Sequence, residues 1–365
     1  MRISIIGPIK QNAKEGKTNP KIFIYQSAFE KLGYETKLFS TSLSKIKVFK
    51  LLSNIKQALR YGDSIVLMLG GNACRKLLKL ILFFNKKRKK RLILCPFGTG
   101  PLNPILSGKS PELVNDFIME RNFHGIKDER MKKTLSKIDC VVAQNDILKR
   151  CFVEFYELNN VKVLPNFRMH SEMKEISKNY KERSIVFISR VVKEKGILDL
   201  IKVVSEINSD KKDEEKIHLC IYGEKHLNSE EDALFNSLLS DTIKYYGPIP
   251  NELVPQTISN YAFSCLPTKH NGEGTPGFIV ESLIAGVPVI ASSYSQVSSI
   301  LTDGYDGIIF KLGDYNDLKA KLCNALADKL VIDQYHKNAF ESGQKYLFEN
   351  NKNIIKEIIE GKKAL

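Results

Sequence analysis

The feature that most constrains this chain is a regular alternation of short apolar runs with longer amphipathic stretches, which fills its 365 residues. The short runs are typical of buried strands, and the stretches between them carry apolar residues at helical spacing. Strands that alternate with helices form parallel sheets covered by helices. The sequence therefore predicts an α/β fold, with strands at 3–6, 36–39, 64–69, 92–95, 140–143 and 161–164, and again at 185–189, 217–222, 243–246, 263–266, 289–291 and 307–310.

The alternation is interrupted once, near the middle of the chain. A polar, lysine-rich stretch without a strong period runs from Pro165 to Arg183, which indicates a linker. A chain of this length also exceeds the size at which one hydrophobic core keeps growing. We therefore predict two Rossmann-like domains, 1–165 and 166–344, and a final helix at about 345–365. Parallel sheets bind ligands beyond the carboxyl ends of their strands, so two such domains facing each other would enclose a cleft.

Charge is divided unequally between the two predicted domains. Residues 1–165 contain 31 Lys and Arg against 13 Asp and Glu, whereas residues 166–365 contain 25 against 28. A domain this basic favours a polyanionic partner, such as nucleic acid, an anionic membrane or a phosphorylated substrate. The seven cysteines are scattered, and several lie within apolar runs. This pattern indicates free thiols in a reducing cytoplasm and not a disulfide framework or a zinc site.

The strongest motif is a glycine-rich loop between a predicted strand and helix. It reads Asn-Gly-Glu-Gly-Thr-Pro-Gly-Phe-Ile-Val-Glu over 271–281, and Gly-Val-Pro-Val-Ile follows at 286–290. Glycines at a helix N-terminus leave backbone N–H groups open to an anion, and proline suits the first helical turn. Glu273 and Glu281 would repel phosphate but accept hydrogen bonds from hydroxyls, so we expect them to hold a sugar and a ribose. The alternative is a plain helix entry with surface glutamates.

A second motif follows the strand predicted at 185–189. Arg190 stands at the end of this strand, and Lys195 precedes Gly196 just before a predicted helix. Two cations in these places could neutralise the charge that grows on a leaving diphosphate. A solvated basic loop is the alternative, which the glutamate motif in the same chain disfavours.

Together the two motifs resemble the family-four, or group 1, retaining glycosyltransferases of the GT-B fold. The resemblance rests on strand-Arg-x4-Lys-Gly and, about 80 residues later, Glu-x7-Glu-x4-Gly-x-Pro-Val-Ile. It covers the C-terminal half by motif and the N-terminal half by architecture. It implies two Rossmann-like domains with parallel sheets facing across a cleft, and a last helix that packs back on the first domain.

The resemblance also implies a role for each residue of the motifs. Glu273 would contact the donor sugar, Glu281 would hold the ribose, and Arg190 and Lys195 would bind the diphosphate; Glu273, Arg190 and Lys195 are the predicted catalytic residues. The other predicted donor-binding residues are Ser189, where the family usually has glycine, and Gly274, Thr275, Pro276 and Gly277. The chain contains no Asp-x-Asp pair, which agrees with a metal-independent enzyme without a cofactor.

The N-terminal half follows the family pattern more loosely. The glycine-rich acceptor loop of the family is matched by Gly7, Gly16 and Lys17. Many members carry a histidine after a strand in the middle of this domain, and here Cys95 to Gly98 occupy that place. His124 is interpreted as a structural or surface residue, so no catalytic histidine is predicted.

An apolar stretch at 74–84 leads into the most basic run of the chain. Such a combination suits docking on an anionic leaflet. The predicted membrane-binding residues are Lys86, Lys87, Arg88, Lys89, Lys90 and Arg91. A solvated turn is one alternative; nucleic acid is another, disfavoured because no aromatic residues interleave the run.

The predicted function is therefore hexosyl transfer from a UDP-sugar to a lipid-linked or surface-polysaccharide acceptor, such as lipopolysaccharide or capsule. The expected partners are the donor, the glycan acceptor and the inner face of the cell membrane, with a cytoplasmic, peripheral location and no nucleic acid. Two alternatives remain: a GDP-mannose-dependent mannosyltransferase, and a non-catalytic membrane- or nucleic-acid-binding protein with the same fold. A dinucleotide oxidoreductase is disfavoured because no Gly-x-Gly-x-x-Gly follows the first strand.

Overall fold

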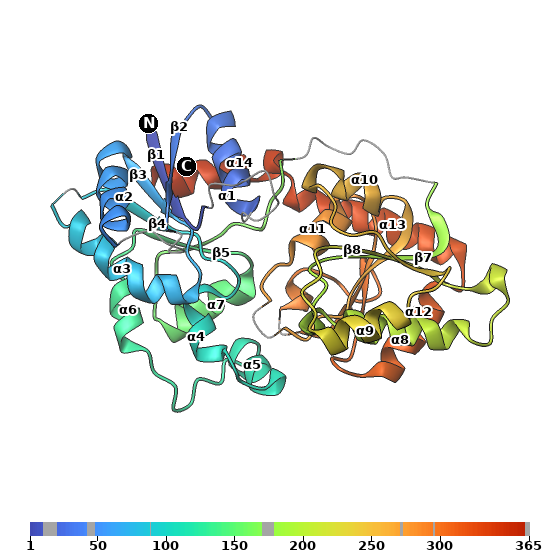
Figure 1. Ribbon diagram of the computed structural model, residues 1–365. Helices are drawn as coiled ribbons and strands as arrows, with labels where there is room; N and C mark the ends of the chain where they lie inside the picture. Colours follow the sequence, from blue (N-terminus) through green and yellow to red (C-terminus); the bar gives the residue numbers. More distant parts are fainter. Residues whose placement is uncertain are drawn as a thin grey trace. The chain divides into compact units, whose positions relative to one another are not determined.

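The computed structural model describes residues 1–9, 20–41, 48–87, 89–169, 179–270, 273–294 and 296–361. The chain divides into two compact units, one formed by Met1–Met169 with Phe348–Leu365 and the other by His170–Leu347. Each unit contains one six-stranded sheet flanked by helices (Figure 1). Every pairing between the described strands is parallel. The prediction of two α/β units with parallel sheets is confirmed.

The sheet of the first unit has the strand order β2-β1-β3-β4-β5-β6. Its strands are β1 Arg2–Gly7, β2 Glu35–Ser40, β3 Ser64–Leu67, β4 Arg91–Leu94, β5 Cys140–Ala143 and β6 Val161–Val163. Its helices are α1 Pro20–Lys31, α2 Val48–Tyr61, α3 Gly71–Asn85, α4 Asn103–Leu106, α5 Pro111–Ile118, α6 Glu129–Leu135, α7 Asp146–Phe155 and α14 Phe348–Glu360. Each predicted strand of this half is found within a few residues of its expected place.

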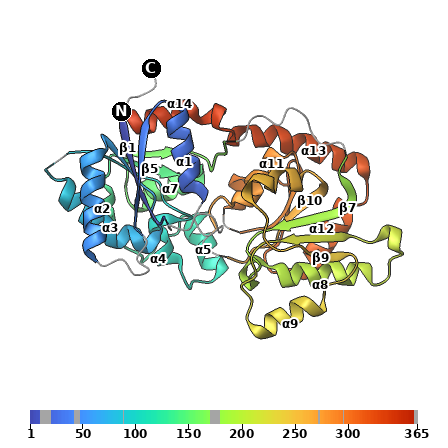
Figure 2. The same cartoon turned by 45° about the horizontal axis from the view of Figure 1, so that its top comes forward.

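Helix α14 comes from the end of the chain but packs in the first unit, beside α1 (Figure 2). Lys31 at the end of α1 forms a 2.7 Å ion pair with Glu349. The Arg91 guanidinium donates to the Ile358 carbonyl at 3.1 and 3.2 Å, and Ile358 and Ile359 are buried. The structural division of the chain therefore falls at Met169 and at Phe348.

The sheet of the second unit has the order β12-β11-β10-β7-β8-β9. Its strands are β7 Lys181–Ile188, β8 His218–Tyr222, β9 Ile243–Tyr245, β10 Tyr261–Leu266, β11 Val289–Ser292 and β12 Gly307–Phe310. Its α-helices are α8 Ile197–Asn208, α9 Ser229–Ser237, α10 Val254–Ile258, α11 Gly277–Ile284, α12 Tyr315–Ala325 and α13 Lys329–Gly343. Short 3-10 turns, among them η3 Lys193–Lys195 and η6 Val297–Ser299, lie between them.

The central strands are apolar on both faces because helices cover both sides of each sheet. All four residues of β3 and all six of β10 are buried. This burial explains why the strands are continuous apolar runs and not alternating ones. Large buried aromatic side chains such as Phe152 and Phe263 fill the spaces between sheet and helices.

Polar side chains fix where several helices begin. Asn145 accepts a hydrogen bond from the Leu148 N–H at 2.8 Å at the start of α7. Asn228 and Glu231 form a reciprocal capping box at the start of α9. Such caps satisfy backbone donors that have no partner inside the helix.

Candidate donor site

The two motifs of the second unit lie side by side because of the strand order. Strands β7, β8 and β9 are neighbours in chain order, whereas β10 pairs with the opposite edge of β7. In the register of this pair, Phe263 lies opposite Ile185 and Ser264 opposite Val186. The crevice beyond the carboxyl ends of strands at such a reversal is where open parallel sheets bind ligands. The Arg190 loop follows β7 and the Glu273 loop follows β10, so both motifs are at this point.

A left-handed glycine lets the two loops approach each other. Gly196 has φ of 73° and stands between η3 and α8. A Cβ at this position would overlap the carbonyl oxygen of Pro267, the residue after β10. Only glycine accepts both the positive φ and the close approach at no steric cost, which accounts for the Lys-Gly pair of the second motif.

A buried ion pair joins the two loops. The Lys195 ammonium contacts Oε1 of Glu273, and both residues are only 8% exposed. The Thr268 hydroxyl lies 3.3 Å from the same carboxylate oxygen and accepts the His270 N–H at 3.2 Å. Burial, reinforced by the charge of Arg190, lowers the pKa of Lys195 to about 8. The sequence identified both partners but did not predict that they would bind each other.

Buried amide and hydroxyl groups hold the Glu273 loop from the other side. The Gln296 side chain, which is fully buried, donates to the Glu273 carbonyl at 2.8 Å. The Ser292 hydroxyl donates to the Thr268 carbonyl at 2.6 Å. Neither Gln296 nor Thr268 was predicted from the sequence, because a single polar residue in a loop has no periodic or motif signal. Both position Glu273.

Arg190 differs from Lys195 in its exposure. Its side chain is exposed, whereas Ser189 before it is half-buried. Arg190 is close enough for its charge, after burial and the charge of Lys195, to lower the pKa of His270. The site thus has one buried and one exposed cation near its carboxylate.

The glycine-rich loop leads directly into α11. Glu273, Gly274 and Thr275 are buried, and Pro276 and Gly277 are half-buried. Pro276 is the N-cap residue, with φ of −60° and ψ of 133°, so it stands just before the helix and not in its first turn, where it was predicted. Glu281 lies half-buried in the second turn. Asn271 and Gly272 lie outside the described residues.

A glycine caps the C-terminal end of α11. Gly286 has φ of 69°, and its N–H donates to the Leu283 carbonyl at 3.0 Å. The Val287 N–H donates to the Ser282 carbonyl at 2.8 Å. These two bonds form a Schellman motif, which requires a left-handed residue and so favours glycine.

The N-terminal candidates are only partly described. Gly7 ends β1, and a Cβ on it would lie 3.1 Å from the Met68 carbonyl oxygen, so it packs against the neighbouring strand. Gly16 and Lys17 lie outside the described residues. Burial raises the pKa of the Cys95 thiol to about 12, so this residue is not a thiolate.

One buried cation of the first unit had no sequence signal. Lys21 lies in the first turn of α1, where its ammonium donates to the Pro96 carbonyl at 3.4 Å. Burial, with a smaller contribution from Arg168, lowers the pKa of Lys21 to about 8. Because Pro96 follows β4, this cation lies at the carboxyl edge of the first sheet, where ligands of parallel sheets bind.

The basic run divides into two parts. Lys86, Lys87 and Lys89 are exposed and Lys90 is half-buried in the turn after α3, whereas Arg88 lies outside the described residues. Arg91 begins β4 and is bound to α14, as described above, so it belongs to the packing of the first unit. Arg91 is therefore not a free member of the predicted membrane-binding patch.

No group of three or more His, Cys, Asp or Glu side chains in the described part of the chain is placed to hold a metal ion. No helix among the described residues has the length and apolar content needed to cross a bilayer.

Comparison with known proteins identifies the family of the second unit. The family model described as glycosyl transferases group 1 matches residues 169–345, nearly the whole second unit. The second unit is a group 1 glycosyltransferase domain. A glycosyltransferase of Methanocaldococcus jannaschii that is described as uncharacterized, MJ1069, is 24% identical over 244 residues, which are 64% of this chain. The chain spans only 58% of that relative's length.

Solved structures of similar fold cover nearly the whole chain. Anabaena HepE, crystallised in complex with UDP, matches with a TM-score of 0.70 and 15% identity, covering 99% of this chain and 100% of HepE. The lipopolysaccharide outer core galactosyltransferase WaaB in its apo form matches with a TM-score of 0.62 and 17% identity, covering 98% of this chain and 100% of WaaB. These matches show that the fold is GT-B.

Proposed function

We propose that this protein transfers a hexosyl group from a UDP-sugar to a carbohydrate acceptor, with retention of configuration and without a metal. The observation that carries the proposal is the buried contact between Lys195 and Glu273 at the strand-order reversal of a group 1 glycosyltransferase domain. UDP is favoured as the nucleotide because the similar HepE structure holds UDP.

The donor diphosphate would bind to Arg190 and Lys195. An ammonium has three N–H donors, so Lys195 can keep Glu273 as a partner and still donate to a phosphate oxygen. The exposed Arg190 offers a planar fork that suits phosphate. Together they would stabilise the negative charge that develops on the leaving group. In metal-dependent transferases, a divalent cation supplies the positive charge that Arg190 and Lys195 would supply here.

The sugar and the ribose would bind to the two carboxylates. Glu273 is held by Thr268, Lys195 and, through its backbone, Gln296. Such support fixes the carboxylate for hydrogen bonds to sugar hydroxyls. Glu281, in the second turn of α11, would accept from the ribose hydroxyls.

In the transfer step, the bond between the anomeric carbon and the diphosphate oxygen breaks as the acceptor oxygen bonds to the same carbon. The anomeric configuration is retained if the acceptor attacks the sugar on the same face from which the leaving group departs. The acceptor proton then passes to the leaving diphosphate oxygen, so no separate base is required. The products are the glycosylated acceptor and UDP.

The acceptor would be lipid-linked or part of a surface polysaccharide. WaaB is a lipopolysaccharide galactosyltransferase, and a Klebsiella pneumoniae relative, 26% identical over 188 residues, is encoded in a cps region. The exposed lysines Lys86, Lys87 and Lys89 would hold the protein at the inner face of the membrane. The expected location is therefore cytoplasmic and peripheral.

The test is a transfer assay that follows UDP release from UDP-hexoses in the presence of lipid and polysaccharide extracts. Wild-type protein should release UDP, and Glu273→Ala should abolish release. Glu214→Ala is a matched control because Glu214 is exposed near the amino end of β8. Excess chelator should leave the rate unchanged, and NMR of the product should show retained anomeric configuration. Release only from GDP-mannose would favour the alternative donor, and equal release by Glu273→Ala would refute the proposed site.

A further inference from the structure

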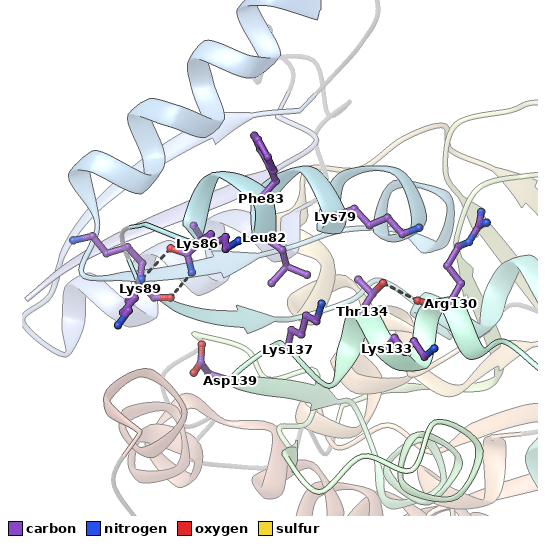
Figure 3. A pocket seen from close by; sticks show the side chains of 12 residues that line it. Lys79, Leu82, Phe83, Lys86, Lys89, Arg130, Lys133, Thr134, Lys137 and Asp139 are labelled. Carbon is purple, nitrogen blue, oxygen red and sulfur yellow. Dashed lines mark hydrogen bonds between the residues drawn. The ribbon is translucent and has the colours of Figure 1, made fainter.

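A basic pocket of about 810 Å³ lies in the first unit, between α3, the turn that follows it, and α6. Figure 3 shows that the two helices contribute from opposite sides. Seven cationic side chains line it against the single carboxylate of Asp139: Lys79, Lys86, Lys89, Lys90, Arg130, Lys133 and Lys137. Three of them come from α6 and the residues just after it, a segment in which the sequence had indicated no site.

The pocket lies at the edge of the sheet away from the ligand-binding edge. Lys90 immediately precedes β4 and Asp139 immediately precedes β5, so the pocket is at the amino ends of these strands. Substrates of open parallel sheets bind beyond the carboxyl ends. The basic pocket is therefore separate from the acceptor edge of the same sheet.

The cations of the pocket lack the partners that neighbouring cations have. Arg75 on α3 pairs with Asp128 at 2.6 Å, and Lys132 on α6 pairs with Glu157. Within the described ranges, none of the seven pocket cations forms a salt bridge. The Asp139 carboxylate is engaged by the Leu92 N–H at 2.7 Å. The pocket consequently has a strongly positive potential.

Hydrogen bonds between a side-chain amide and the backbone hold part of the pocket wall in place. The Asn85 side-chain amide donates to the Lys90 carbonyl at 2.8 Å and accepts the Lys90 N–H at 2.9 Å. Lys89 has a positive φ of 51° in this turn. The lysines therefore extend from a defined turn, which reduces the cost of gathering them around a ligand.

An exposed aromatic residue accompanies the cations. Phe83, near the end of α3, is 71% exposed and borders the pocket. Basic side chains around an exposed apolar residue are typical of proteins that bind anionic lipid surfaces. Single-stranded nucleic acid sites instead stack successive bases on several aromatic residues, and Phe83 is the one aromatic residue among the described residues that line this pocket.

We propose that the basic pocket binds the phosphate headgroup of an anionic phospholipid, with Phe83 entering the interfacial region. This inference rests on the membrane-bound location in the proposed function and names the residues that would produce it. The contribution of α6 makes it a recessed headgroup site and not only a charged turn.

The test is co-sedimentation with phosphatidylcholine vesicles that contain or lack phosphatidylglycerol. Lys133→Gln with Lys137→Gln should weaken binding to the anionic vesicles about thirtyfold, since each basic residue near such a surface contributes about 1 kcal/mol. Lys149→Gln with Arg150→Gln is the matched control, because it removes the same charge from exposed positions on α7. The control should bind like the wild type, and all binding should fall with salt.

Several outcomes would overturn the inference. They are equal binding by the two double variants, equal binding to vesicles with and without phosphatidylglycerol, and displacement from the vesicles by a single-stranded oligonucleotide but not by glycerol phosphate. UDP release from a UDP-hexose is measured on the same samples. If the wild type binds anionic vesicles but releases no UDP, the transferase proposal alone is refuted. If the wild type releases UDP but the Lys133→Gln with Lys137→Gln variant binds vesicles as the wild type does, the pocket proposal alone is refuted.

Discussion

Replacing Glu273 with glutamine would test the buried ion pair directly. The amide keeps the size of the side chain and its contact with Thr268, but it leaves the Lys195 ammonium buried without a counter-charge. Removing one partner of a buried pair costs about 3–5 kcal/mol. An upper bound follows from Lys195 itself, because the folded variant can release the proton. At pH 7 this costs about 1.4 kcal/mol relative to the wild type, because pH 7 lies one unit below the wild-type Lys195 pKa of about 8; the loss is therefore smaller than for a buried cation that cannot titrate.

The destabilisation should therefore depend on pH. In the variant the folded-state pKa of Lys195 falls further, so the unfolded chain binds a proton that the folded chain does not. Stability then rises with pH up to the unfolded-state pKa. At pH 9 the same bound is close to zero, because Lys195 of the wild type has already released most of its proton. The loss relative to the wild type should shrink between pH 7 and pH 9.

Urea unfolding at pH 7 and pH 9, followed by circular dichroism because the chain has no Trp, measures both losses. Adding Lys195→Met to Glu273→Gln removes the unpaired charge and should restore most of the stability at pH 7. The reasoning is refuted if the loss is the same at both pH values, or if the double variant is no more stable than Glu273→Gln.

Three further predictions concern the same site. Gly196→Ala should destabilise the protein more than Gly313→Ala, because both residues have positive φ but only at Gly196 would a Cβ overlap another residue; thermal unfolding of the pair measures the difference. Gln296→Leu should lower the free energy of unfolding by about 1–3 kcal/mol, because it leaves the buried Glu273 carbonyl without its donor. Calorimetry should also show weaker UDP-sugar binding. An unchanged affinity would exclude a role of Gln296 in positioning Glu273. The wild-type kcat/KM should fall as the pH rises through about 8, where Lys195 loses its proton. Arg190→Gln should move this fall to higher pH, because Arg190 lowers the pKa of Lys195. If the fall occurs at the same pH in the variant, Lys195 is not the group that causes it.

The strands were predictable because their residues are buried on both faces. The runs at 65–67 and 289–291 are continuously apolar, a pattern that an amphipathic helix does not show. The Schellman glycine at Gly286 was predictable for a similar reason, since a left-handed backbone position limits the residue type.

The neighbours of each strand were not predictable in the same way. Periodicity indicates that β7 and β10 exist, but not that they pair, and this pairing is what brings Lys195 to Glu273. Gln296 comes to the site by the same route, from a turn beyond β11. The short helices α4 and α5 were missed because they are too brief for a clear period. Periodicity also does not show that α6 lies beside the basic run, so the run could not be seen as one wall of a pocket.

The central claim is that Arg190, Lys195 and the two glutamates form a nucleotide-sugar site, and a thermal-shift panel of UDP-, GDP-, ADP- and CMP-sugars tests it most directly. A ligand at 100 times its Kd stabilises the folded state by about 2.7 kcal/mol, which such an assay detects. We expect the largest shift with a UDP-sugar and the loss of this shift in Arg190→Gln with Lys195→Gln. The absence of stabilisation by every nucleotide-sugar, or an equal shift in the double variant, would contradict it.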